Sequence, residues 1–133
     1  MTDYAIDTIA LVKYLEDDLP RGADLVFRGA EDGRHHLFLP EIALGEFAYI
    51  ALRGRLRTAD PTAAVGAVVS EVLDSGFIEP TGLSRNGWSL FLNLPVPELH
   101  DRMIAASALD RRCPLVTNDP SFQQVTDLRT IWR

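Results

Sequence analysis

Four acidic residues stand where a carboxylate is unusual, and they are the candidates for chemistry: Asp7, Glu46, Asp101 and Asp119. Asp7 and Asp119 each follow a short apolar run of the kind that forms a buried strand. Glu46 lies in the middle of a run that is apolar almost all round, which predicts a largely buried helix. Asp101 is followed at helical spacing by apolar residues, so it shares their face. The other acidic residues lie in polar stretches that are typical of a solvated surface.

Crowded carboxylates of this kind need a counter-charge. A charged and unpaired carboxylate inside a protein costs several kcal/mol, and neighbouring carboxylates repel until some of them take up protons. A divalent cation removes the conflict, and Mg²⁺ and Mn²⁺ prefer oxygen ligands in octahedral geometry, with waters completing the shell. Such sites typically act on phosphates, because the metal activates a water, neutralises the phosphate and stabilises the leaving oxygen.

Each of the four acids also has a structural explanation when it is considered alone. Asp7 and Asp119 fit the N-cap position of a following helix. Asp101 fits the first turn of a helix, where the helix dipole favours a negative charge. The dipole does not explain why Asp101 lies on the apolar face of that helix. Glu46 fits either a buried ion pair with an arginine or a solvent-facing stripe of its helix.

The elements that would position these acids alternate between short strands and helices. The strands are expected at residues 4–6, 36–39, 77–78, 115–117 and 130–132. The helices are expected at residues 8–15, 23–30, 41–53, 61–75, 83–92 and 98–111, with a short turn at 120–122. Trp88 and Phe91 lie three residues apart on one of these helices and could form a dimer surface, but core packing is the expectation. Brief, fully apolar strands predict an α/β fold, in which a short parallel sheet is flanked by helices on both faces. In such folds, ligands bind beyond the carboxyl ends of the strands.

Composition limits the possible classes of protein. The length of 133 residues predicts one domain over residues 1–133. With 13 basic and 19 acidic residues, the net charge of −6 argues against a protein that coats nucleic acid through bulk positive charge. The single cysteine, Cys113, cannot form an internal disulfide and fits a reducing cytosol. No apolar run is long enough to span a membrane and the first residues form no signal peptide, so a cytoplasmic protein is expected.

Four segments, in order, resemble the PIN-domain family of metal-dependent ribonucleases, which includes the VapC toxins of prokaryotic toxin–antitoxin pairs. They are a strand end at residues 5–8, an acid-bearing helix at 39–46, an Asp-x-x-Ile-Ala-Ala-x-Ala stretch within 99–109, and a strand end at 114–119. The resemblance runs from Asp7 to Trp132 and implies a PIN-like, three-layer α/β/α fold.

By this resemblance, the four acids form the quartet that holds Mg²⁺ or Mn²⁺. Asp7 and Asp101 would be central ligands, while Glu46 and Asp119 would complete the pocket directly or through waters. Thr8 and Thr117 would lie beside the site as hydroxyl donors. The implied reaction is hydrolysis of an RNA phosphodiester by a metal-activated water, which leaves a 5′-phosphate and a 3′-hydroxyl. Many relatives carry a further acid where this chain has Ser121, so the number of metal ions is left open.

The expected partner is RNA and, if the chain is a toxin, the resemblance implies a cognate antitoxin and commonly a homodimer. Arg53, Arg55 and Arg57 cluster after the Glu46 helix, and Arg102 adjoins Asp101, so these arginines are candidates to contact the RNA backbone. A solvated loop explains the cluster of three equally well.

Three other functions compete with a toxin nuclease. An RNA-maturation nuclease would carry the same four acids. A PIN-like module that binds RNA or protein without turnover would not need all four. A phosphatase with an Asp nucleophile usually carries a second Asp two residues after the first, but Asp7 is followed by Thr8 and Ile9. The sequence also has no Gly-rich nucleotide-binding fingerprint.

Overall fold

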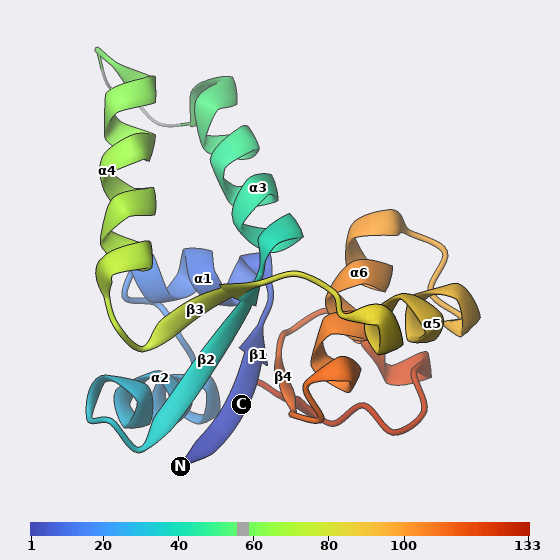
Figure 1. The fold of residues 1–133 in the computed structure, drawn as a ribbon. Coiled ribbons are helices and arrows are strands. Elements are labelled where there is room, and N and C mark those ends of the chain that lie inside the picture. Colours follow the sequence, from blue (N-terminus) through green and yellow to red (C-terminus); the bar gives the residue numbers. More distant parts are fainter. Residues whose placement is uncertain (56–58) are drawn as a thin grey trace.

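The computed structural model describes residues 1–55 and 59–133, in which strands alternate with helices along the chain (Figure 1). The strands are β1 (Thr2–Ile6), β2 (His35–Pro40), β3 (Ile78–Thr81), β4 (Leu115–Val116) and β5 (Thr130–Ile131). They form one sheet in the order β3-β2-β1-β4-β5, and every neighbouring pair is parallel. The expected parallel α/β fold is therefore confirmed.

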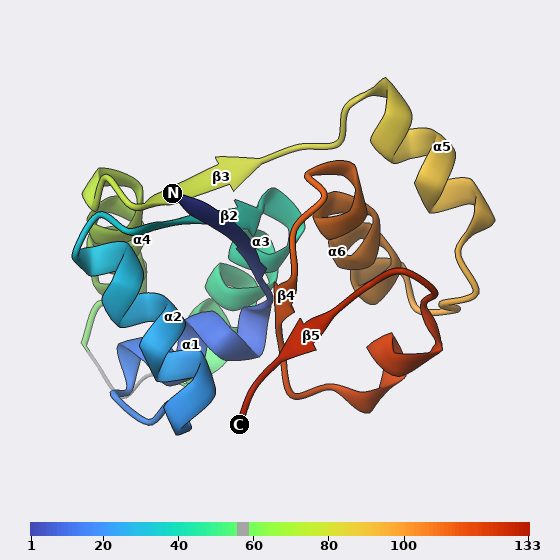
Figure 2. The ribbon, with the colours of Figure 1, turned by 90° about the horizontal axis from the view of Figure 1, so that it is seen from below.

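Helices cover both faces of this sheet. They are α1 (Thr8–Leu15), α2 (Arg21–Glu31), α3 (Glu41–Ile50), α4 (Pro61–Asp74), α5 (Arg85–Asn93) and α6 (Leu99–Asp110), with a short 3₁₀ turn, η2 (Pro120–Gln124). Figure 2 shows α1, α2 and α4 on one side of the sheet and α5 and α6 on the other. Within the described residues, no helix is long and apolar enough to cross a membrane.

The strands are short, and β1 and β4 are buried at their carboxyl ends. Ala5 and Ile6 of β1 are completely buried, as are Leu115 and Val116 of β4. The register pairs Ile6 with Val116, so the residues that follow these two strands emerge side by side. The Asp7 backbone N–H also donates a hydrogen bond to the Val116 carbonyl at 3.3 Å. This pairing brings the first and the fourth candidate acid to the same edge of the sheet.

Two expectations about the helices need correction. The helix expected over residues 41–53 ends at Ile50, and a kinked turn, η1 (Ala51–Arg55), follows it. The kink occurs where Gly54 adopts a φ of 89°, a conformation that glycine accommodates easily. Core packing was expected for Trp88, but its side chain is 49% exposed, and its ring meets that of Phe91 edge-on at 5.4 Å.

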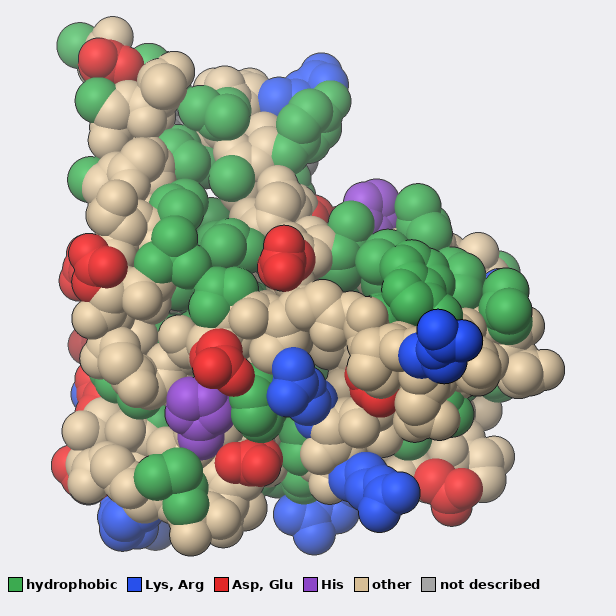
Figure 3. All heavy atoms as spheres, in the orientation of Figure 1, with side chains coloured by type: hydrophobic (Ala, Val, Ile, Leu, Met, Phe, Trp, Pro, Cys, Tyr) green, Lys and Arg blue, Asp and Glu red, His purple; other side chains and the backbone are tan. Residues whose placement is uncertain are grey.

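Apolar side chains also gather on the surface. α3 and α4 extend away from the sheet (Figure 1), and green apolar atoms lie between them and over α5 (Figure 3). The exposed large residues of this region include Tyr49, Ile50, Leu52 and Leu73. The fold therefore carries a partly apolar arm beside the carboxyl edge of its sheet.

Candidate functional site

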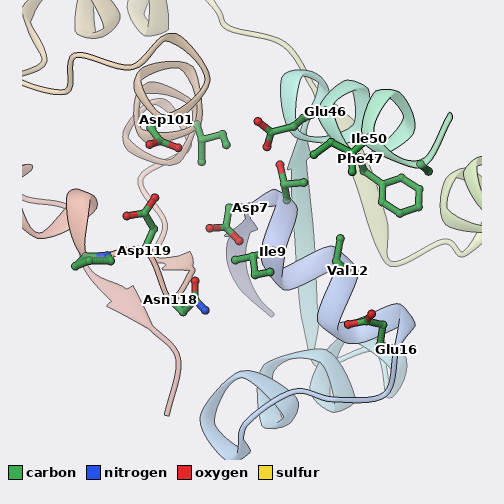
Figure 4. A pocket seen from close by; sticks show the side chains of 14 residues that line it. Asp7, Ile9, Val12, Glu16, Glu46, Phe47, Ile50, Asp101, Asn118 and Asp119 are labelled. Atoms are coloured by element: carbon green, nitrogen blue, oxygen red, sulfur yellow. The ribbon is translucent and has the colours of Figure 1, made fainter. Parts of the chain in front are cut away.

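The four predicted acids line one cavity beyond the carboxyl ends of the strands. This cavity, the acid cleft, has a volume of about 790 Å³. Asp7 lies between β1 and α1, Glu46 in α3, Asp101 in the first turn of α6, and Asp119 between β4 and η2. Figure 4 shows the four side chains around the same opening. Four separate elements therefore converge here, as expected from the topology of a parallel sheet.

Asp7 is the most deeply buried of the four, with 5% of its surface exposed. Its Oδ1 atom accepts a hydrogen bond from the Ala10 backbone N–H at 2.9 Å, so Asp7 is also the N-cap of α1. Burial raises the pKa of Asp7 to about 6, against the opposing effects of Thr117 and the Ala10 amide. The charges of Asp119 and Asp101 contribute to this rise. The negative charges of Asp101 and Asp119 therefore repel that of Asp7.

Asp119 combines the same two roles. Its Oδ1 atom accepts a hydrogen bond from the Ser121 backbone N–H at 2.9 Å, which caps η2, and its own N–H donates to the Thr117 hydroxyl at 3.0 Å. The capping explanation is thus confirmed for both Asp7 and Asp119. In each case the cap uses one carboxylate oxygen, so capping does not prevent the second oxygen from binding a ligand.

Asp101 lies opposite Asp7, at the start of α6. The cap of that helix is Glu98, whose Oε2 atom accepts from the Asp101 backbone N–H at 2.7 Å. The carboxylate of Asp101 is therefore not needed as a cap. The pKa of Asp101 is raised to about 6, chiefly by burial, and the charges of Asp119, Glu98 and Glu46 contribute to this rise.

Glu46 is half-buried on α3, and a histidine side chain lies beside it. His100 Nδ1 lies 4.0 Å from a Glu46 carboxylate oxygen and 2.6 Å from Glu98 Oε1. The hydrogen bond with Glu98 raises the pKa of His100, and the Glu46 and Asp101 charges add to this rise. Sequence reasoning gave His100 no role in the site, although its position next to Asp101 was a signal. An ion pair with an arginine was one structural alternative for Glu46, but the basic side chain found beside it is this histidine.

The donor set of the acid cleft fits a hard divalent cation that is held partly through water. All four side chains offer carboxylate oxygens, the ligands that Mg²⁺ and Mn²⁺ prefer. As placed, no three His, Cys, Asp or Glu side chains in the described part of the chain are close enough to hold one ion. Mg²⁺ usually keeps several waters and binds one or two carboxylates directly, so the spacing fits a water-bridged ion.

Of the two predicted hydroxyl residues, Thr117 contacts the acids, whereas Thr8 contacts the backbone of α3. Thr117 is buried, accepts from Asp119, and acts on Asp7 as a hydrogen-bond partner. Thr8 lines the acid cleft, and its hydroxyl donates to the Ala43 carbonyl of α3 at 3.4 Å. Ser121 donates its backbone N–H to Asp119, and its buried Oγ has no hydrogen-bond partner within the described residues.

The predicted RNA-contacting arginines occupy different surroundings. Arg53 Nη1 donates to the Tyr49 hydroxyl at 2.9 Å, and its guanidinium lies 5.5 Å from the centre of that ring. The side chain of Arg55 and the whole of Arg57 lie outside the described residues. Arg102 donates from Nε to the Val96 carbonyl at 2.8 Å and from Nη2 to the Leu94 carbonyl at 2.6 Å. Arg102 is therefore better explained as a brace for the loop before α6 than as an RNA contact.

Replacing Arg102 by alanine is expected to lower the free energy of unfolding by about 2 kcal/mol. The substitution removes two charge-assisted hydrogen bonds and the packing of the guanidinium on the Phe91 ring, 5.5 Å away. Urea unfolding of Arg102→Ala measures the change. Arg85→Ala, at an exposed arginine of α5, is the control and should change little. Equal losses in both variants would contradict the bracing role.

Sequence reasoning also missed the apolar wall of the acid cleft. Ile9 and Val12 of α1 face Phe47 and Ile50 of α3 along the cleft, which extends to Glu16 (Figure 4). The spacing of Ile9 and Val12 along the first helix was a signal for one shared face, but neither residue was predicted to line the site. The cleft is thus acidic at the sheet edge and mostly apolar along α1 and α3.

The family model of the PIN domain matches residues 4–128, and the chain therefore belongs to the PIN-domain family. Similar solved structures include VapBC2 from Rickettsia felis, bound to a promoter DNA fragment, with a TM-score of 0.75, 17% identity and 97% of each chain covered. VapBC-5 from Mycobacterium tuberculosis has a TM-score of 0.67, 16% identity and 100% of each chain covered. FitAcB from Neisseria gonorrhoeae has a TM-score of 0.62 and 18% identity, with 96% of this chain and 95% of that one covered.

These structural likenesses establish the fold, a three-layer α/β/α arrangement of the PIN type. Comparison with curated protein sequences returns no match. The PIN-like fold implied by the four sequence segments is thus confirmed.

Proposed function

We propose that this protein is an endoribonuclease that hydrolyses RNA phosphodiester bonds with the help of Mg²⁺ or Mn²⁺. The observation that carries the proposal is the acid cleft, in which four carboxylates from four elements face one another. Two of these carboxyls have their pKa raised to about 6, in part by the charges of their neighbours. A cation in the cleft would offset this repulsion, and membership of the PIN-domain family supports nuclease chemistry.

The roles of the residues follow from their surroundings. Asp7 and Asp101 would hold the metal, which when bound activates a water and neutralises the phosphate. Asp7 is kept in place by its cap bond to Ala10 and by Thr117. Asp119, fixed by the Ser121 N–H, would complete the metal pocket directly or through waters. Glu46 would accept the proton of the attacking water, and His100, 4.0 Å from its carboxylate, would help to hold the Glu46 side chain in place.

A cleavage assay tests this proposal. Purified protein is incubated with unstructured RNA and Mn²⁺, and the wild type is compared with Asp101→Asn. We expect metal-dependent cleavage in the wild type and a loss of at least about a hundredfold in the variant, because a charged ligand is removed. Asp127→Asn is the control: Asp127 is exposed, and its φ of 69° suits asparagine equally well. Equal cleavage by wild type and Asp101→Asn would overturn the site assignment.

Calorimetry with Mn²⁺ alone complements the cleavage assay, because it needs no choice of RNA. Binding by metal-stripped wild type, lost or much weakened in Asp101→Asn, would support the acid cleft as the metal site. If the wild type took up no metal even with RNA present, the catalytic proposal would fail and a PIN-like binding module would become the leading alternative.

We further propose that the nuclease is the toxin of a toxin–antitoxin pair. The solved relatives named above include VapBC proteins, one of them from a VapBC family of toxin–antitoxin systems. The apolar wall of the acid cleft, formed by α1 and α3, suits a protein segment better than an RNA backbone. Induced expression of the wild type should arrest growth, while Asp101→Asn should not. Normal growth with active wild-type enzyme would favour an RNA-maturation nuclease. A homodimer and a cytoplasmic location stay predictions.

A further inference from the structure

A second cavity adjoins the acid cleft on the far side of the β4–η2 loop. This side cavity has a volume of about 440 Å³, and its lining includes Asn118, Gln123, Thr130, Trp132 and Arg133. It shares Asn118, Asp119 and Pro120 with the acid cleft, so one loop forms a wall of both. The two cavities are therefore neighbours on either side of this loop.

The walls of the side cavity are fixed by the backbone. β5 pairs with β4, and the Thr117 N–H donates to the Ile131 carbonyl at 3.1 Å. On the other side, the Ala23 N–H of α2 donates to the Trp132 carbonyl at 2.8 Å. α2 comes so close that a Cβ at Gly22 would lie 2.2 Å from the Arg133 carbonyl oxygen. The segment that carries the aromatic and the basic side chain is thus held between β4 and α2 (Figure 2).

The side chains of this cavity differ in kind from those of the acid cleft. Trp132 is half-buried and packs against the core, which limits the motion of its ring. Gln123 Nε2 donates to the Thr130 hydroxyl at 3.0 Å, which orients its amide. Among the described residues that line the two cavities, Arg133 is the single basic one. An aromatic ring, two carboxamides and a guanidinium thus stand directly beside the acids.

We propose that the side cavity binds one nucleotide of single-stranded RNA, next to the phosphodiester in the acid cleft. The base would stack on Trp132, and the adjoining phosphate would meet Arg133. Proteins recognise single-stranded RNA by stacking splayed bases on aromatic rings and by pairing phosphates with arginine. The carboxamides of Asn118 and Gln123 are placed to contact the base edge. This inference rests on the proposed ribonuclease function and names the residues that select its substrate.

Tryptophan fluorescence provides a direct test, because the chain has two tryptophans. Trp88→Phe leaves Trp132 as the only tryptophan, and Trp132→Phe leaves Trp88 on α5 as the matched control. The probes are five-nucleotide RNAs of A, U, C or G alone, titrated in EDTA so that no cleavage occurs. We expect saturable quenching in Trp88→Phe and none in Trp132→Phe. Quenching that is equal in both variants, or absent from both, would overturn the inference.

A second measurement separates the side cavity from the metal site. Trp132→Leu keeps apolar packing but removes the flat ring, so its KM for RNA should rise about five- to 150-fold, as for the loss of one base stack. Its affinity for Mn²⁺ alone should not change. Arg133→Gln should lower the slope of log Kd against log salt by about 0.7, as for one lost contact to a single strand. Arg85→Gln, at an exposed arginine that lines neither cavity, should leave this slope unchanged.

The outcomes also distinguish this inference from the proposed function. If Trp132→Leu cleaves RNA with the KM of the wild type, the side cavity is not a nucleotide site, and the acid cleft keeps its role. If the wild type neither binds nor cleaves any of the RNAs, both proposals fail. Quenching by an apolar or acidic peptide instead of RNA would indicate a protein partner at Trp132.

Discussion

Asp7→Asn is expected to abolish metal-dependent RNA cleavage and at the same time to stabilise the metal-free protein. Asparagine keeps the cap bond to the Ala10 N–H, because it is as good an N-cap as aspartate. It removes the buried negative charge that a metal would need. Activity should therefore fall at least about a hundredfold, while the free energy of unfolding in EDTA at pH 7.5 rises by about 1–3 kcal/mol.

The direction of the stability change follows from the raised pKa of Asp7, which is about 6 in the folded protein against 3.8 as the ordinary value. The folded state then binds the proton more tightly than the unfolded state, so wild-type stability falls as the pH rises from about 4 to about 6. The asparagine side chain cannot titrate, so the Asp7→Asn variant lacks this fall. Urea unfolding in EDTA should give similar stabilities for both proteins near pH 4 and a clear difference above pH 6.

Asp60→Asn is the matched control for this prediction. Asp60 also caps a helix, accepting from the Ala63 N–H at 3.0 Å, but it is exposed. The same chemical change there should alter stability by less than about 0.5 kcal/mol and leave cleavage intact. A metal-free Asp7→Asn protein that is less stable than the wild type at pH 7.5 would contradict the unfavourable burial of this charge.

Mn²⁺ binding is expected to weaken about a hundredfold between pH 7 and pH 5. Asp7 and Asp101 both have a pKa of about 6, and both must lose their protons before they can act as ligands. Over this range each carboxyl goes from mostly ionised to mostly protonated, which costs about tenfold in affinity per group. Near pH 6, where each is about half protonated, binding should release about one proton per ion.

Calorimetry at several pH values, in buffers of different ionisation enthalpy, measures both the affinity and the protons released. Asp60→Asn should show the wild-type profile, because it leaves the acid cleft unchanged. Mn²⁺ affinity that does not vary between pH 5 and pH 7 would show that these two carboxyls are not the ligands. It would leave the fold and the family unaffected.

Much of the fold was predictable from the sequence because its local signals agree. The apolar runs that became β1 and β4 are completely buried at Ile6 and Val116, and Asp60 with Pro61 marks the start of α4 as expected. The expected end of α3 was wrong because its apolar pattern continues to Leu52, while the backbone turns at Gly54. Periodicity reports which face of a helix is apolar, but it does not show where the axis bends.

The candidate site was predictable only in part. The four acids could be found because strand ends and an inward helix face are visible in a sequence, and the structure gathers all four in one cavity. The bracing role of Arg102 was not visible, because its partners are backbone carbonyls of a preceding loop. The side cavity was missed for a related reason: Trp132 comes close to Asn118 only through the pairing of β5 with β4.

The double use of Asp7 and Asp119 has a consequence for the history of such chains. Both residues start a helical turn as well as facing the acid cleft, so selection for folding alone would keep an Asp, Asn or Ser at these two positions. Glu46 caps nothing, and only its place in the cleft explains why it is a carboxylate. A lineage that abandoned catalysis would therefore lose Glu46 first. Among related sequences, the presence of Glu46 would therefore distinguish chains that keep the activity from chains that have lost it better than Asp7 and Asp119 would.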